Sequence, residues 1–134
     1  MDKIEAEVNF KTGNATERPE DARLVSFQAI DMPGHGHFED SMLDAADAAQ
    51  AILLVLDAKD RAKYGEAAEF LFSLLNKHSV IEDETPIVIV CNKQDLQFSK
   101  KATVIELELE KEIEAIKRVR TARNEDDEPG YLEL

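Results

Sequence analysis

The chain has 134 residues, a length that fits one domain, and 43% of them are hydrophobic, enough to form a core. Acidic residues outnumber basic ones by 29 to 16, and the formal net charge of -13 argues against nucleic acid as a direct partner, because phosphate backbones attract basic surfaces. The single cysteine excludes an internal disulfide framework. No apolar run approaches the roughly 18 residues that a membrane-spanning helix needs, and no secretory signal opens the chain.

The first thirty residues predict two strands. Residues 4–10 alternate apolar and polar side chains, which is typical of a half-exposed strand. Residues 11–22 are polar, contain glycine and proline, and predict a turn. Residues 24–30 predict a second strand, which is followed by Asp31 and a Pro-Gly pair. Strands this close in sequence favour antiparallel pairing.

The rest of the chain alternates helices with buried strands. Residues 51–56 and 86–92 are continuous apolar runs, typical of strands that are covered on both faces of a parallel sheet. Helices are predicted before, between and after these strands, at residues 38–50, 63–78 and 99–123. Strand and helix in alternation predict an α/β fold with a mostly parallel sheet and flanking helices.

Ligands of such folds bind at the carboxyl ends of the strands, so the residues there are the candidate binding residues. Three groups stand at these ends: Asp31-Met32-Pro33-Gly34, Asp57-Ala58 and Asn92-Lys93-Gln94-Asp95. The first and third, in this order, resemble the third and fourth guanine-nucleotide motifs of the GTPase superfamily. The alternative is that both are turns, in which Asn, Asp and Pro-Gly serve only the backbone.

Asp95 is the residue that we expect to select guanine. A carboxylate accepts two hydrogen bonds side by side, and guanine, unlike adenine, offers a ring N–H and an amine in that arrangement. The Asn92 side chain can hold the loop or meet the purine edge, and the stem of Lys93 can lie over the base. Such a site rejects the wrong base by roughly 10⁴-fold, because a mismatch leaves buried polar groups unpaired.

The first motif is expected at the nucleotide phosphates. In the superfamily, the position of Asp31 holds Mg²⁺, and Gly34 offers its backbone N–H to the terminal phosphate. His35 stands where many GTPases hold the residue that orients the attacking water, which makes it the candidate catalytic residue. The alternatives for His35 are a solvent-facing loop residue or a metal cluster with His37, Asp31 and Glu39.

Longer stretches around the motifs resemble the signal recognition particle receptor beta subunit family. The likeness covers roughly residues 4–123 and is carried by residues 30–35, 51–57, 68–71, 91–95, 109–113 and 118–123. The ADP-ribosylation-factor group shares Asn-Lys-Gln-Asp, and translational GTPases share Asp-x-Pro-Gly-His. The combination of Ala-Glu-Phe-Leu with Cys-Asn-Lys-Gln-Asp points to the receptor subunit.

The resemblance implies a P-loop GTPase-like domain of a small GTPase that works at the endoplasmic reticulum. Members of the family lie on the cytosolic face of that membrane, held by an N-terminal membrane helix. In the GTP form they bind the receptor's alpha subunit and support co-translational protein targeting. The implied ligands are GTP and Mg²⁺, and the implied protein partner is the alpha subunit.

The resemblance also gives each motif residue a role. Asn92, Lys93 and Asp95 are implied to bind guanine. Asp31 and Gly34 are implied to sense Mg²⁺ and the γ-phosphate. Residues 34–43 are implied to form the second switch, in which Phe38 is a candidate partner contact.

The sequence departs from the family in one motif, because no G-x-x-x-x-G-K-[ST] occurs in it. Without that loop the phosphates lose a nest of N–H groups and a lysine charge. We therefore expect residues 1–134 to be a partial small-GTPase domain, from the second strand through the helix after the fourth motif and truncated at both ends. We expect this piece alone to bind GTP weakly or not at all. An ADP-ribosylation-factor-like or translation-type GTPase, a pseudo-GTPase scaffold that binds a partner without nucleotide, and an acidic domain with chance motifs remain alternatives.

Overall fold

The protein is described from a computed structural model, which covers residues 2–10, 23–34 and 36–126. Two compact units make up the chain, residues 1–42 and residues 43–134. The predicted turn at 11–22 and the candidate catalytic residue His35 lie outside the described residues.

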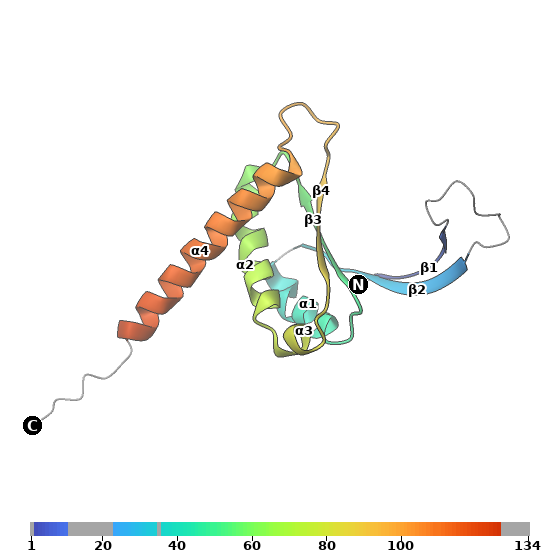
Figure 1. Ribbon diagram of the computed structural model, residues 1–134, viewed down its shortest axis with the longest axis horizontal. Coiled ribbons are helices and arrows are strands. Elements are labelled where there is room, and N and C mark those ends of the chain that lie inside the picture. The colour runs from blue at the N-terminus through green and yellow to red at the C-terminus, as the bar shows by residue number, and fades with distance from the viewer. Residues whose placement is uncertain (1, 11–22, 35, 127–134) are drawn as a thin grey trace, which may run out of the picture. The chain divides into compact units, whose positions relative to one another are not determined.

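The first unit is built on two paired strands. β1 (Asp2–Phe10) runs antiparallel to β2 (Arg23–Asp31), in register along their whole length (Figure 1). The predicted antiparallel pairing is therefore confirmed. A short 3-10 helix, η2 (Gly36–Phe38), leads into α1 (Glu39–Ala46), within which the first unit ends and the second begins. This helix is shorter than the predicted 38–50, because the chain tightens after it into bonds between residues three apart.

The second unit holds a parallel pair of strands, β3 (Ile52–Asp57) and β4 (Ile87–Asn92). Ile52 lies opposite Ile87 and Asp57 opposite Asn92, so both strands end at the same edge of the sheet. The connection between them contains η3 (Arg61–Lys63), α2 (Tyr64–Leu75) and α3 (His78–Glu82), and α4 (Ala102–Asp126) follows β4. The α/β fold with a parallel sheet, consistent with a small-GTPase-like domain, is confirmed.

Two helix predictions need correction. The predicted helix 63–78 is two helices, because the Asn76 side chain donates to the Phe72 carbonyl at 2.7 Å and Lys77 then adopts an extended backbone. The last helix begins at Ala102 rather than at Ser99, whose residue type suited an N-cap. The Ser99 hydroxyl instead donates to the Lys93 carbonyl, 2.6 Å away, which keeps this segment in the preceding loop.

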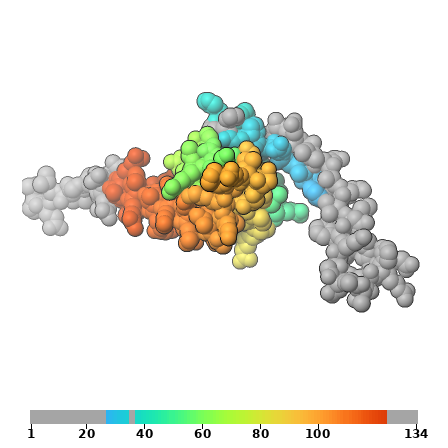
Figure 2. Space-filling view, turned by 90° about the horizontal axis from the view of Figure 1, so that it is seen from above, coloured from blue at the N-terminus to red at the C-terminus, as the bar shows by residue number. Residues whose placement is uncertain are grey.

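The core of the second unit lies on one face of the β3–β4 sheet. Side chains of Leu54 and Leu56 pack there with residues of α2 and α4, of which Ala68 and Ile105 are fully buried. Figures 1 and 2 show α4, in orange, running against α2, in green. Farther along α4, the guanidinium carbon of Arg120 stands 4.5 Å from the centre of the Phe72 ring. The amphipathic spacing predicted for both helices thus forms their shared contact.

A second, smaller cluster lies at the other end of the sheet. It joins Ala46 of α1, Leu74 of α2 and Val80 of α3 to the first residues of both strands. No helix among residues 36–126 is both long and apolar enough to cross a bilayer.

Candidate functional site

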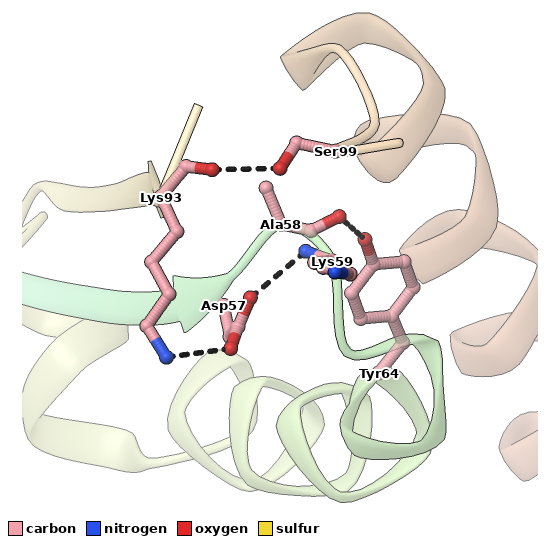
Figure 3. A network of polar contacts seen from close by, with 6 residues as sticks. All are labelled: Asp57, Ala58, Lys59, Tyr64, Lys93 and Ser99. Atoms are coloured by element: carbon pink, nitrogen blue, oxygen red, sulfur yellow. Dashed lines mark hydrogen bonds and ion pairs between the residues drawn. The ribbon is translucent and has the colours of Figure 1, made fainter. Parts of the chain in front are cut away.

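The carboxyl ends of β3 and β4 bring two of the three predicted strand-end groups together. Asp57 and Asn92 are the last residues of their strands and lie opposite each other. The next residue of the motif, Lys93, reaches across the strand ends, and its ammonium Nζ lies 2.8 Å from Oδ2 of Asp57 (Figure 3). An ion pair therefore links the Asn-Lys-Gln-Asp motif to the neighbouring strand.

Hydrogen bonds within the loop after β4 hold the motif in shape. Lys93 has a φ of 63°, in the left-handed region that non-glycine residues rarely adopt. Its carbonyl accepts the Ser99 hydroxyl at 2.6 Å and the Leu96 N–H at 3.1 Å. The Gln94 side chain donates to the carbonyl of Lys100 at 2.9 Å. The motif is thus held by hydrogen bonds to Leu96, Ser99 and Lys100, which follow it in sequence.

Ala58 anchors this loop to the core. Its N–H donates to the Asn92 carbonyl at 3.0 Å, and its own carbonyl accepts the Lys100 N–H at 3.1 Å. The same carbonyl accepts the hydroxyl of Tyr64 at 2.7 Å, a bond that Figure 3 shows to the right of Asp57. Burial raises the pKa of Tyr64, so its phenol stays protonated and donates. Three elements, β3, α2 and the loop, meet at this residue.

Both members of the ion pair carry charge at neutral pH. The hydrogen bond from Lys93 lowers the pKa of Asp57, and the Lys59 N–H, which donates to Oδ1 at 2.9 Å, lowers it further. The same hydrogen bond raises the pKa of Lys93. Both shifts move away from neutrality, so the pair keeps its charges across the neutral range.

The two side chains expected to read a base edge face solvent. Asn92 and Asp95 are exposed, and neither side chain makes a hydrogen bond within the described part of the chain. The charge of Asp95 acts on Lys93, where it helps to raise the pKa of the ammonium. A carboxylate and an amide thus stay available for a ligand, on a loop that is held in place.

The first motif lies in the other unit. Asp31 is the last residue of β2 and is exposed, and so is Gly34. A Cβ on Gly34 would meet no atom within 4 Å, and its φ is not in the left-handed region. The structure therefore gives no steric reason for glycine at this position. Phe38, the candidate partner contact, is 42% exposed.

The donor groups at Asp31 fit Mg²⁺ only in part. Among the side chains of residues 27–34 and 37–123, no three His, Cys, Asp or Glu gather as metal ligands. Mg²⁺ is usually held by one or two carboxylates together with substrate phosphates, so a single carboxylate such as Asp31 suits a site that a nucleotide completes.

Two other residues, His78 and Cys91, also carry reactive side chains. His78 begins α3, faces solvent, and its Nε2 lies 3.1 Å from Oε1 of Glu82. Cys91 packs against the core, where burial raises the pKa of its thiol. Neither residue belongs to the strand-end site.

Sequence reasoning missed the roles of Asp57, Tyr64 and Ser99. Asp57 stood among the strand-end residues, but no local pattern links it to a lysine 36 positions later. Tyr64 could have been found, because a tyrosine on the buried face of a helix needs a partner for its hydroxyl.

Comparison with known proteins agrees with the motifs. The family model for the signal recognition particle receptor beta subunit matches residues 5–130. The signal recognition particle receptor subunit beta of Mus musculus is 33% identical over 99 residues, which cover 72% of this chain and 37% of that protein. The human protein of the same name is 33% identical over 110 residues, or 81% of this chain and 41% of its own.

More distant similarity extends to another group of small GTPases. ADP-ribosylation factor-like protein 6 of Caenorhabditis elegans is 28% identical over 101 residues, 75% of this chain and 48% of that protein. The chain spans less than half the length of each of these curated relatives. Because the family model covers nearly all of its residues, the chain belongs to the signal recognition particle receptor beta subunit family.

Proposed function

We propose that the loop after β4 binds the guanine base of a nucleotide. The observation that carries the proposal is the exposed Asp95 carboxylate on a loop braced by Ser99 and Gln94. In this assignment Asp95 pairs with the guanine edge, Asn92 supports the purine or the loop, and the Lys93 stem lies along the base plane. Groups held in place before binding lose little entropy when the ligand arrives.

The residues of the first motif and those that follow it take the phosphate end in this proposal. Asp31 would hold Mg²⁺, which neutralises phosphate charge when it is bound, and Gly34 would donate its backbone N–H to the γ-phosphate. His35 would orient a water molecule. Residues 34–43 would respond to the γ-phosphate as a switch, with Phe38 contacting a partner.

The biological role that we propose is that of the receptor's beta subunit. The whole protein would be a GTPase that acts in co-translational protein targeting, on the cytosolic face of the endoplasmic reticulum membrane. Its protein partner would be the receptor's alpha subunit. Family membership supports this role, and so does the name that the mouse and human relatives share.

The test is a titration of the isotope-labelled chain with GTP, GDP, ADP and xanthosine diphosphate in the presence of Mg²⁺, followed by NMR. We expect GDP to bind more tightly than ADP, with a dissociation constant weaker than micromolar because the sequence lacks G-x-x-x-x-G-K-[ST]. Micromolar or tighter binding of GTP would contradict the expected weakness. Equal affinity for GDP and ADP would contradict guanine recognition itself.

Asp95→Asn sharpens the test. Xanthine has a carbonyl where guanine has its amine, and an amide can donate to that carbonyl while a carboxylate cannot. We expect Asp95→Asn to lose about tenfold in GDP affinity and to gain affinity for xanthosine diphosphate. Asp83→Asn, a change at the exposed residue that follows α3, serves as the control and should alter neither constant.

A second candidate function for residues 1–134 is that of a scaffold, which binds the alpha subunit without nucleotide. A pull-down of the alpha subunit by the nucleotide-free chain distinguishes the two. Binding that is unchanged by added GTP and by Asp95→Asn would support the scaffold.

A further inference from the structure

Asp57 uses both of its carboxylate oxygens, and the two contacts are of different kinds. Oδ1 accepts the Lys59 N–H at 2.9 Å, a contact between residues that are two positions apart in sequence. Oδ2 accepts the Lys93 ammonium at 2.8 Å, a contact between the two strand ends. The short-range bond fixes the carboxylate, and the fixed carboxylate then holds a lysine on the neighbouring loop (Figure 3).

Lys93 is therefore held at both ends of its side chain. Its backbone has the left-handed φ of 63° and is tied through its carbonyl to Ser99. Its ammonium is tied to Asp57, although the lysine side chain is 52% exposed. A long exposed lysine ordinarily samples many rotamers, so this degree of restraint is unusual for its position.

Other bonds already join the two strand ends. The Ala58 N–H reaches the Asn92 carbonyl at 3.0 Å, and the Lys100 N–H reaches the Ala58 carbonyl at 3.1 Å. The strands themselves pair up to Asp57 and Asn92. The fold of this edge therefore does not depend on the ion pair, which leaves the orientation of the lysine stem as its distinct effect.

We infer that Asp57 is a positioning residue for nucleobase binding, which acts by holding Lys93 in the orientation that lies along the base. The inference rests on the guanine-binding function proposed above. Restraint of the lysine before the ligand arrives removes an entropy cost from the binding step. The aliphatic stem of Lys93 is thus already oriented to pack against the base when the ligand arrives.

Asp57→Asn tests the inference with little change in shape. The amide oxygen can still accept the Lys59 N–H, while the charge that holds Lys93 is gone. We expect the dissociation constant for GDP to rise about three- to tenfold, because the stem of Lys93 is no longer held along the base. The ¹³Cε resonance of Lys93, followed against pH without nucleotide, should show its pKa falling back toward the ordinary 10.5.

Two further variants separate positioning from general charge effects. Asp60→Asn removes another negative charge that acts on Lys93, without removing the hydrogen bond to Asp57, and should change GDP affinity by less than about twofold. In a Lys93→Met background, Asp57→Asn should have no further effect, because there is no ammonium left to hold.

The outcomes distinguish this inference from the function on which it rests. If Asp57→Asn shifts the Lys93 resonance but leaves GDP affinity within about twofold of wild type, the inference is overturned and guanine recognition stands. A loss that persists in full in the Lys93→Met background also overturns it. If the wild-type chain does not distinguish GDP from ADP, the proposed function fails and the inference fails with it.

Discussion

The two faces of the β3–β4 sheet have the same apolar character in sequence but different surroundings in the structure. Leu54 and Leu56 point to the face that α2 and α4 cover, and Leu56 is only 6% exposed. Leu53 and Val55, their direct neighbours, point to the opposite face and are 65% and 59% exposed. Val88 of β4 shares that open face.

The difference shows what a continuous apolar run does and does not predict. Successive residues of a strand point to opposite faces, so a run that is apolar throughout predicts cover on both. In the part of the chain that the structure describes, helices cover one face. The stability of the second unit should therefore come from the covered face alone.

Among the variants that test this comparison, Ile105→Ala should have the largest effect on the free energy of unfolding. Ile105 lies on α4, is fully buried and packs against the covered face. Its truncation should lower the free energy of unfolding by about 2–5 kcal/mol, because transfer energy is lost and a cavity remains. Urea denaturation followed by circular dichroism measures the change.

Leu107→Ala is the matched control for this variant. Leu107 lies two residues farther along the same helix and is 57% exposed. Its truncation should change the free energy of unfolding by no more than about 0.5 kcal/mol. Equal losses in the two variants would show that α4 does not pack as described.

Glu108→Gln should have a smaller effect, which depends on pH. Glu108 of α4 accepts a hydrogen bond from Lys100, and its Oε2 lies 3.5 Å from Nε of Arg61. The bond from Lys100 chiefly lowers the pKa of this carboxyl below its ordinary 4.5. The folded chain then binds fewer protons here than the unfolded chain, so Glu108 stabilises above pH 4.5, and this contribution is lost as the pH falls through the lowered pKa.

The measurement is a series of urea midpoints at closely spaced pH values on both sides of 4.5. The midpoint should fall more steeply on acidification in wild type than in Glu108→Gln. Glu106→Gln, at an exposed residue of the same helix, should follow the wild-type curve. Parallel curves for Glu108→Gln and wild type would show that this ion pair does not stabilise the packing of α4.

Local sequence patterns predicted the strands of this unit closely. The predicted strand 51–56 differs from β3 by one residue at each end, and the predicted strand 86–92 differs from β4 by one residue at its start, because polar residues bound each apolar run. The motif loop was placed correctly at the end of β4 for the same reason. Those patterns act over a few neighbouring residues, which is the range that a sequence shows directly.

Individual side-chain contacts, two of them local and one between strands, decided what the apolar patterns did not show. Ser99 has the chemistry of an N-cap, yet its hydroxyl bonds the Lys93 carbonyl and the helix begins three residues later. The break between α2 and α3 depends on a bond from Asn76 to Phe72 within an apolar pattern that continues past it. The pair of Asp57 and Lys93 requires the parallel register itself, which only the folded sheet provides.

Leu53→Thr combined with Val55→Thr should have the smallest effect on stability and tests the open face directly. Threonine is β-branched, a shape that suits a strand, and the two side chains lose little burial because they are already exposed. The free energy of unfolding should change by no more than about 0.5 kcal/mol, while binding of the apolar dye ANS should decrease. Leu54→Thr, one position away on the covered face, should destabilise the unit clearly. A loss above about 1 kcal/mol from the double variant would mean that the face of Leu53 and Val55 is covered in solution, and the contrast between the two faces would then be wrong.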